Sequence, residues 1–365
     1  MGPLQVEEPH PVNPEMVTLA REARGLTQSD LASRLDVSQA RLSKIEAGLL
    51  DVPEDLWNKM AKTLGYPMRF FLLTDQIMGP GMSEFFHRKR QATSAKLLRR
   101  LHANMNIRMI NIARLLQAVE VERDDIPRID PDEFEGSVDE IAAAVRAHWQ
   151  LPRGPIKDLT RVIEDAGGIV VPCDFGSPLL DAMSRYVPGL PRVFFVDQRA
   201  PGDRQRLTLA HELGHVVMHQ VPHAEMETQA FRFAAELLMP AKGIRPQFDT
   251  VDIPKLAAMK PYWKVSMGAL LKRAGDLGKI SQRKQRYLWS QMASAGYRTR
   301  EPAELDIPSE VPRLLMEIID VHRNELGYGL AELSDLMVLT ESEVKSVFGI
   351  EPTATERRTR LRVVP

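Results

Sequence analysis

The sequence has little of what marks a secreted or membrane protein. It has one cysteine, Cys173, in 365 residues, so no disulfide can form within the chain. No run of about 18 apolar residues occurs, so we expect no membrane-spanning helix. Residues 1–16 are rich in proline and acid, and they lack the basic and then apolar pattern of a signal peptide. We therefore predict a cytoplasmic protein without a membrane partner.

Acidic residues are also missing from one long segment. The chain has 48 Lys and Arg against 49 Asp and Glu, a formal net charge of −1. Residues 87–119 nevertheless contain no acid, and their Lys and Arg residues are Arg88, Lys89, Arg90, Lys96, Arg99, Arg100, Arg108 and Arg114. Such a block fits a polyanion partner, and it equally fits a solvated helix face that pairs with acids elsewhere. The sequence leaves both interpretations open.

Residues 14–73 have the pattern of several short helices. Asn13 can cap the first, with Pro14 at the first helical position. The segment from Thr27 to Asp30 has the form of a capping box for the second helix, and Ser38 can cap the third. The sequence thus predicts an all-α unit at the N-terminal end.

Later segments mix helices and strands. Residues 94–121 are predicted as one long basic helix, because apolar residues recur at helical spacing. The predicted elements that follow are helices at 138–149 and 159–166, strands at 169–171 and 192–196, helices at 203–221 and 225–239, and a mostly helical remainder at 249–349. The fold class is therefore mainly α with one small α/β (α+β) domain.

His211, Glu212 and His215 form an HExxH motif within an apolar helical segment. Residues four apart lie on one helical face, so both imidazoles can bind one ion. Glu212 can then reach a metal-bound water and act as a general base. The motif predicts a zinc site of the metallopeptidase type. The alternative is two helix histidines with ordinary partners.

A catalytic zinc usually has a third protein ligand. The extended HExxHxxGxxH pattern fails, because Met218 and Val221 stand where Gly and His are needed. The residues that remain as candidates are Glu225, Glu227 and Glu236 on the next helix, and the histidines His219 and His223. Glu227 shares a face with Ala230 and Ala234, whose small side chains would let the two helices approach closely.

The segments 204–215 and 227–240 together resemble the ImmA/IrrE family of zinc metallopeptidases. In that family two histidines and a Glu three residues before an Ala bind zinc, so the resemblance implies His211, His215 and Glu227 as ligands. Gln229 stands where the family usually has an acid, and Phe231 where it has Asn or Asp. The resemblance covers most of 150–310. It implies a protein substrate, often a repressor, and relatives also occur as antitoxins beside a toxin.

Residues 16–66 resemble a phage-repressor-type (XRE) helix-turn-helix, through 26–28, 31–32, 37–38 and 42–48. The third helix of that motif enters the major groove of double-stranded operator DNA. Gln can read adenine and Arg can read guanine. The candidate contacts are Gln28, which could bind phosphate, and Ser38, Gln39, Arg41, Ser43 and Lys44. The alternative is a helical domain kept for protein contacts.

Together these patterns predict four parts: a helix-turn-helix domain at 1–79, a basic helical connector at 80–150, a zinc-peptidase domain with a helical extension at 151–300, and a helical region at 301–365. The predicted function is a transcriptional regulator coupled to an endopeptidase that cleaves a protein partner such as a repressor. The strand at 192–197 is expected to hold an extended substrate by its edge. The alternative is a non-enzymatic regulator or antitoxin that grips a repressor or toxin. The oligomeric state stays open, with a homodimer as one candidate.

Overall fold

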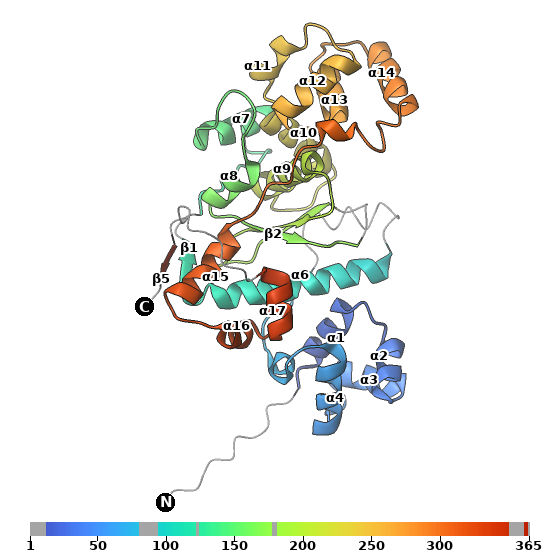
Figure 1. Ribbon diagram of the computed structural model, residues 1–365, viewed down its shortest axis with the longest axis vertical. Coiled ribbons are helices and arrows are strands. Elements are labelled where there is room, and N and C mark those ends of the chain that lie inside the picture. The colour runs from blue at the N-terminus through green and yellow to red at the C-terminus, as the bar shows by residue number, and fades with distance from the viewer. Residues whose placement is uncertain (1–11, 80–93, 122–123, 177–180, 350–360, 364–365) are drawn as a thin grey trace, which may run out of the picture. The chain divides into compact units, whose positions relative to one another are not determined.

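The computed structural model describes residues 12–79, 94–121, 124–176, 181–349 and 361–363 (Figure 1). Its internal contacts divide the chain into two compact units. Unit 1 combines residues 1–80, 93–120 and 316–365, and unit 2 combines residues 81–92 and 121–315. The fold is mostly helical with a small mixed sheet, as predicted. The division into four parts stays a prediction. No described helix is long and apolar enough to cross a membrane.

The N-terminal part of unit 1 is a cluster of short helices. They are α1 Pro14–Ala23, α2 Gln28–Leu35, α3 Gln39–Glu46, α4 Glu54–Leu64 and the 3-10 helix η1 Met68–Leu72. The predicted caps are confirmed: Asn13 accepts from the backbone of Glu15, Thr27 and Asp30 form a reciprocal capping box, and Ser38 accepts from the backbone of Arg41. These caps satisfy backbone N–H groups that a helix start leaves without partners.

The rest of unit 1 is built on α6, Ala95–Leu115. The C-terminal helices of this unit are α15 Leu314–Asn324, α16 Leu330–Met337 and α17 Glu341–Phe348. The amide of Asn111 on α6 donates to the carbonyl of Met337 at 2.7 Å, and a ring nitrogen of His322 lies 2.8 Å from the carbonyl oxygen of Leu115. These buried contacts explain why residues far apart in the sequence belong to one unit.

The helix predicted at 94–121 is too long. It ends at Leu115, and Val119–Val121 forms strand β1, which pairs with β5, Leu361–Val363. The β-branched valines favour a strand, and pairing with a distant segment outweighs the helical spacing of the preceding residues. The basic residues Arg88, Lys89 and Arg90 lie outside the described residues.

Unit 2 contains a three-stranded sheet. Its strands are β2 Ile169–Cys173, β3 Ala182–Arg185 and β4 Val193–Asp197, in the order β2-β4-β3. The pair β2–β4 is parallel, and the pair β3–β4 is antiparallel. The expectation that the strand at 192–197 offers a free edge to a substrate is therefore wrong, because β4 is the central strand. The edge next to it belongs to β3, a strand that the sequence pattern did not reveal.

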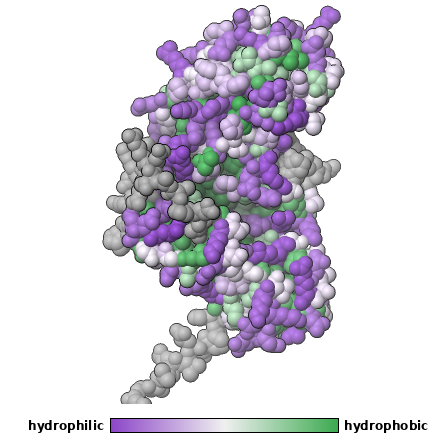
Figure 2. Space-filling model, in the orientation of Figure 1, coloured by the Kyte–Doolittle hydropathy of each residue, from purple (hydrophilic) through white to green (hydrophobic). Residues whose placement is uncertain are grey.

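Helices pack against this sheet. They are α7 Val138–His148, α8 Leu159–Asp165, α9 Gly202–Met218, α10 Met226–Leu238, α11 Ala241–Ile244, α12 Ile253–Trp263, α13 Met267–Asp276 and α14 Gln282–Ser294, with the 3-10 helices η2 Arg245–Gln247 and η3 Ala303–Leu305. Figure 1 shows α7–α10 on one side of the sheet and α11–α14 beyond them. One apolar core runs from Ile126 to Met292 through these elements. Hydrophilic side chains cover most of the face in view (Figure 2).

A buried arginine anchors the start of α9. Arg206 is 2% exposed, and its guanidinium pairs with the carboxylate of Glu310 and donates to the carbonyl of Ile156 at 2.9 Å. Glu310 also accepts from the backbone N–H groups of Leu159 and Thr160 at the start of α8. The segment that carries Glu310 passes so close to α9 that a Cβ at Gly202 would lie 2.4 Å from the carbonyl oxygen of Ile307. These contacts fix the helix that carries HExxH.

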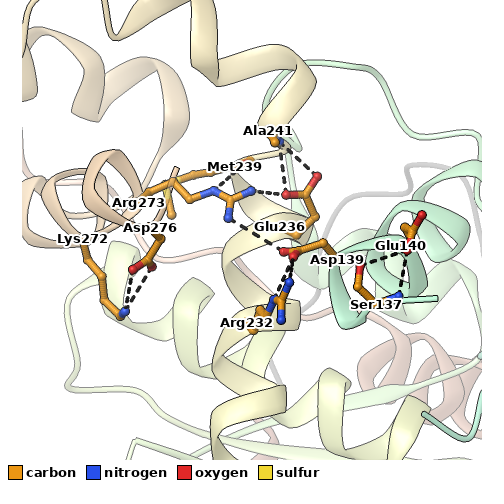
Figure 3. Close-up of polar contacts among 10 residues, drawn as sticks. All are labelled: Ser137, Asp139, Glu140, Arg232, Glu236, Met239, Ala241, Lys272, Arg273 and Asp276. Atoms are coloured by element: carbon orange, nitrogen blue, oxygen red, sulfur yellow. Dashed lines mark hydrogen bonds and ion pairs between the residues drawn. The ribbon is translucent and has the colours of Figure 1, made fainter. Parts of the chain in front are cut away.

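A second buried network holds the far face of α10 (Figure 3). The carboxylate of Glu236 pairs with the guanidinium of Arg273 and accepts from the backbone N–H of Ala241 at 3.0 Å. Arg273 also donates to the carbonyl of Met239 at 3.0 Å. Asp139 on α7 lies 3.9 Å from the guanidinium of Arg273, and it also pairs with Arg232 of α10 at 2.5 Å. The carboxylate of Glu236 therefore links α10 to α11 and α13.

This network generates a stability prediction. We expect Glu236→Ala to lower the free energy of unfolding by about 3–5 kcal/mol, because it leaves the buried guanidinium of Arg273 without its counter-ion. The matched control is Lys272→Ala, which removes an exposed ion pair with Asp276 within α13 and should cost less than about 1 kcal/mol. Thermal and denaturant unfolding of the full chain would measure both. Equal effects of the two substitutions would show that the Glu236 network does not stabilise the unit.

Candidate metal centre

The predicted trio of His211, His215 and Glu227 lies together in unit 2. The two histidines stand one turn apart on α9, and Glu227 stands in the first turn of α10. Nε2 of His215 lies 3.0 Å from Nε2 of His211 and 3.1 Å from Oε1 of Glu227. Nε2 of His211 lies 3.6 Å from Oε2 of Glu227. One atom from each side chain falls within 4.8 Å of the others.

The chemistry of these atoms suits a cation. Imidazole nitrogens and a carboxylate oxygen all present lone pairs, and lone pairs brought this close repel one another unless a proton or a metal ion lies among them. Two His and one Glu is a ligand set that zinc accepts, and it leaves one coordination position open. Both histidines are buried, which limits competition from bulk water. The role of the three residues as ligands remains a prediction.

Glu212 lies beside the trio and is 2% exposed. The hydroxyl of Ser184 on β3 donates to Oε2 of Glu212 at 2.7 Å. Burial raises the pKa of the Glu212 carboxyl, which makes its ionised form a stronger base. Ser184 was not among the residues predicted from the sequence, because the segment Ala182–Arg185 has neither the alternation nor the β-branched residues that indicate a strand. Only pairing with β4 makes this segment a strand.

His219 contacts His215 at the ring nitrogen that faces away from His211 and Glu227. Its Nδ1 lies 2.9 Å from Nδ1 of His215, and its Nε2 lies 2.9 Å from Oε1 of Gln229. When Nε2 of His215 serves as a ligand, the proton of that ring sits on Nδ1 and donates to His219, whose own proton then sits on Nε2 and donates to Gln229. Burial lowers the pKa of His219 to about 4, so the ring is neutral near pH 7. Gln229 thus completes the chain with an amide, at the position where the resemblance leads one to expect an acid.

The other candidate ligands lie elsewhere. Glu236 is held by Arg273, as described above, and Glu225 is an exposed residue at the start of α10. His223 is exposed, and its ring centroid lies 5.2 Å from that of His219. His219 contacts His215 rather than joining the trio. Of the candidates considered from the sequence, Glu227 is the one that approaches both HExxH histidines.

Phe231 adds an aromatic ring to the site. Its ring centroid lies 4.2 Å from that of His211, and the residue is 40% exposed. It sits one turn after Glu227 on α10. The ring therefore contacts one side of the His211 imidazole and still presents apolar surface to solvent.

The predicted DNA-contacting residues lie in unit 1, at the start of α2 and along α3 from its N-cap to its last turn. Ser38, Gln39, Arg41 and Lys44 are exposed, and Gln28 and Ser43 are half-buried. The amide of Gln39 donates to the side-chain oxygen of Gln28 at 2.8 Å, and Gln28 donates to Glu46 at 2.8 Å. Arg21 pairs with the same carboxylate at 2.6 Å. This buried-to-exposed chain fixes the two glutamines side by side; their contacts with DNA remain a prediction.

The basic residues of α6 have acidic neighbours. Arg114 pairs with Asp75 at 2.9 Å, and the longer contacts Arg99–Glu22 and Lys96–Asp30 span 3.8 and 3.9 Å. The side chains of Lys96 and Arg99 remain more than half exposed. They line a cavity of about 360 Å³ together with Gln28 and Gln39. The described part of the basic block therefore partly pairs with acids, and it still borders the predicted DNA-contacting residues.

Two segments of the chain match known families. Residues 164–274 match the family model of the IrrE N-terminal-like domain, and residues 18–71 match the model of a helix-turn-helix. No curated protein matches the chain. The first segment contains the trio and Glu212, and the second contains α2 and α3 with their exposed residues. Both resemblances expected from the sequence are confirmed, and the chain joins an XRE-type helix-turn-helix domain to a domain of the ImmA/IrrE peptidase family.

Proposed function

We propose that this protein is a DNA-binding transcriptional regulator whose unit 2 is a zinc-dependent endopeptidase. Its substrate would be a protein partner such as a repressor or a toxin. The observation that carries the proposal is the convergence of His211, His215 and Glu227 within 4.8 Å, directly beside the buried Glu212. Ligands and base come from two helices fixed against each other, which is the arrangement that hydrolysis at a metal site needs.

Zinc would be held by Nε2 of each histidine and a carboxylate oxygen of Glu227. When bound, it would supply Lewis-acid polarisation of a peptide carbonyl and lower the pKa of a water molecule. His219 and Gln229 would hold His215 in the tautomer that leaves Nε2 available. Positioning of this kind typically matters because ligand orientation sets metal affinity.

Glu212 would act as the general base and acid. Its carboxylate accepts the proton of the attacking water while the water oxygen bonds to the carbonyl carbon. It then passes this proton to the amide nitrogen as the C–N bond breaks. The hydroxyl of Ser184 holds Oε2 of Glu212, which leaves Oε1 for the proton transfer. The second proton of the water also ends on the leaving amine, so the products are a carboxylate and an ammonium group, and no further reactant is needed.

An extended substrate would bind along β3. This strand lies at one edge of the sheet, and its residue Ser184 contacts Glu212. A peptide added to this edge would gain backbone hydrogen bonds while one of its carbonyl groups lies near the trio. Phe231 would contact an apolar side chain of the substrate near the cleaved bond, because its exposed ring borders His211.

Unit 1 would bind operator DNA by inserting the start of α3 into the major groove. Arg41 and Gln39 are exposed there and have the donor geometry that reads guanine and adenine. Ser38 caps the start of α3, Lys44 and the half-buried Ser43 lie in its last turn, and Gln28 would contact phosphate. Lys96 and Arg99 on α6 would add phosphate contacts next to Gln28.

The first of three functional predictions distinguishes the proposed zinc ligand Glu227 from the other acidic residues of α10. We expect wild-type protein to bind about one zinc ion per chain. Glu227→Ala should weaken zinc binding about 100-fold or more, because it removes a ligand. Glu225→Ala, on the same helix but exposed, should leave the affinity unchanged, and Glu236→Gln should lower stability without lowering affinity. Chelator competition monitored by metal analysis would measure this, and unaltered zinc affinity in Glu227→Ala would refute the assignment.

The second prediction concerns catalysis. Glu212→Gln keeps every ligand and the shape of the side chain, so zinc content and DNA binding should be unchanged. Cleavage of the partner should slow by about 10²–10⁴-fold, because the proton acceptor is lost. The measurement is the rate of cleavage of the protein that copurifies with the Glu212→Gln variant. If this variant retains full regulatory activity in cells, the domain serves as a non-enzymatic docking module.

The third prediction concerns DNA. Arg41→Ala or Gln39→Ala should reduce discrimination between the chain's own promoter DNA and random DNA by about 1–3 kcal/mol per lost base contact. Lys62→Ala is the control, because this exposed basic residue lies in the last turn of α4, outside α2 and α3. Titrations with both duplexes at the same salt concentration would measure the ratio. Absence of any binding to promoter DNA at low salt would favour the protein-contact alternative for this domain.

A further inference from the structure

A second stretch without acids lies in unit 2. Residues 277–300 contain no Asp or Glu, and their basic residues are Lys279, Arg283, Lys284, Arg286, Arg298 and Arg300. The stretch comprises helix α14 and the loops on either side of it. Figure 1 places α14 on the outer side of the helical group α11–α14 (orange). The neutral polar residues of α14 are glutamine, serine and tyrosine.

The basic residues of α14 share one exposed face. Leu288 and Met292 are buried and attach the helix to the core of unit 2. Arg283, Lys284 and Arg286 are exposed, and Tyr287 is 60% exposed. Tyr287, Ser290 and Ser294 follow Arg283 at helical spacing, so the solvent face carries hydrogen-bond donors along its whole length.

These charges are not neutralised within the described part of the chain. None of Arg283, Lys284 and Arg286 has a described carboxylate within 4.0 Å, and the same holds for Lys279 and Arg298. Other basic residues of the same unit do pair: Arg161 with Asp165 at 3.1 Å, Arg199 with Asp174 at 2.8 Å and Lys255 with Asp249 at 3.3 Å. The face of α14 is thus an uncompensated positive surface.

The position of these charges disfavours the helix itself. Arg283, Lys284 and Arg286 all lie in the first half of α14, and its first turn contains no acid. The N-terminal end of a helix carries partial positive charge, so cations there oppose the helix dipole. A helix selected for stability alone would carry acids at these positions. The arrangement instead favours an anionic partner.

We propose that the exposed face of α14 binds the phosphate backbone of double-stranded DNA without reading its sequence. Arginine, lysine, tyrosine, glutamine and serine are the side chains that contact phosphates in protein–DNA complexes. Tyr287 is the one large hydrophobic side chain of α14 that is exposed, and the charged and polar side chains around it favour a phosphate backbone over an acidic protein as the partner. The inference relies on the proposed DNA binding of unit 1 only for bringing the chain to DNA; α14 supplies its own contacts.

The test uses the full chain and a duplex of random sequence. In the triple variant Arg283→Ala, Lys284→Ala, Arg286→Ala, we expect binding to weaken by about tenfold or more near 50 mM salt. The slope of log K against log salt concentration should fall in magnitude by about 2 to 3, since each lost phosphate contact contributes about 0.9. The matched control is Arg161→Ala, Arg199→Ala, Lys255→Ala, which removes the same charge from residues that already have acidic partners.

Four outcomes decide the matter. Weaker binding with a lower slope in the α14 variant alone supports the proposal. An equal loss in both triple variants would assign the effect to net charge and overturn it, and so would unchanged DNA binding in the α14 variant. Binding to polyglutamate that is lost in the α14 variant, with DNA binding intact, would identify an acidic protein as the partner. A failure of the proposed DNA binding by unit 1 can be distinguished from a failure of this proposal. Arg41→Ala should alter the ratio of promoter to random binding, and the α14 variant should leave that ratio unchanged.

Discussion

The candidate metal centre depends on how closely α9 and α10 approach. At their crossing stands Gly214, where a Cβ atom would lie 3.0 Å from Cδ1 of Phe233 and 3.3 Å from Cα of Ala230. A larger residue at either small position would push the helices apart. The Glu227 side chain is short, so a wider separation of the two helices would move its carboxylate out of contact with the two histidines. The packing of two apolar helices therefore sets the distance between ligands that lie twelve to sixteen positions apart in the sequence.

Two acidic residues of helix α10 lie on opposite sides of the helix. Glu227 and Glu236 are nine residues apart, which corresponds to two and a half turns, so the two carboxylates point in opposite directions. Glu227 faces α9 and the histidines, while Glu236 faces Arg273 and Ala241. One end of the helix is thus fixed by a buried ion pair, and the other end is left to present a carboxylate. Once the direction in which either side chain points is known, the nine-residue spacing predicts that the other acid points away from the histidines.

Local signals in the sequence were sufficient for much of the fold. Helix caps at Asn13, Thr27 and Ser38 depend on neighbouring residues, and so does the HExxH pair, and these predictions needed no knowledge of tertiary contacts. Features that depend on pairing between distant segments were not predictable. Strand β3 exists because it pairs with β4, and the central position of β4 follows from strand order. Ser184 beside Glu212 and Gln229 behind His219 are consequences of such placement.

Two stretches without acids have different surroundings in the folded chain. On α6, Lys96, Arg99 and Arg114 have acidic neighbours from the helix-turn-helix and the residues that follow it, whereas the three basic residues of α14 have none within 4.0 Å in the described chain. An uninterrupted run of positive charge in a sequence is therefore ambiguous until the positions of the acids are known. The helix-turn-helix and the metal centre lie in separate units, and the core from Ile126 to Met292 that surrounds the metal centre lies wholly within unit 2. Substitutions in one unit can therefore test the proposed metal chemistry, and substitutions in the other can test the proposed DNA contacts. Under the proposed function, the protein partner itself would link cleavage to regulation, because cleavage would remove that partner.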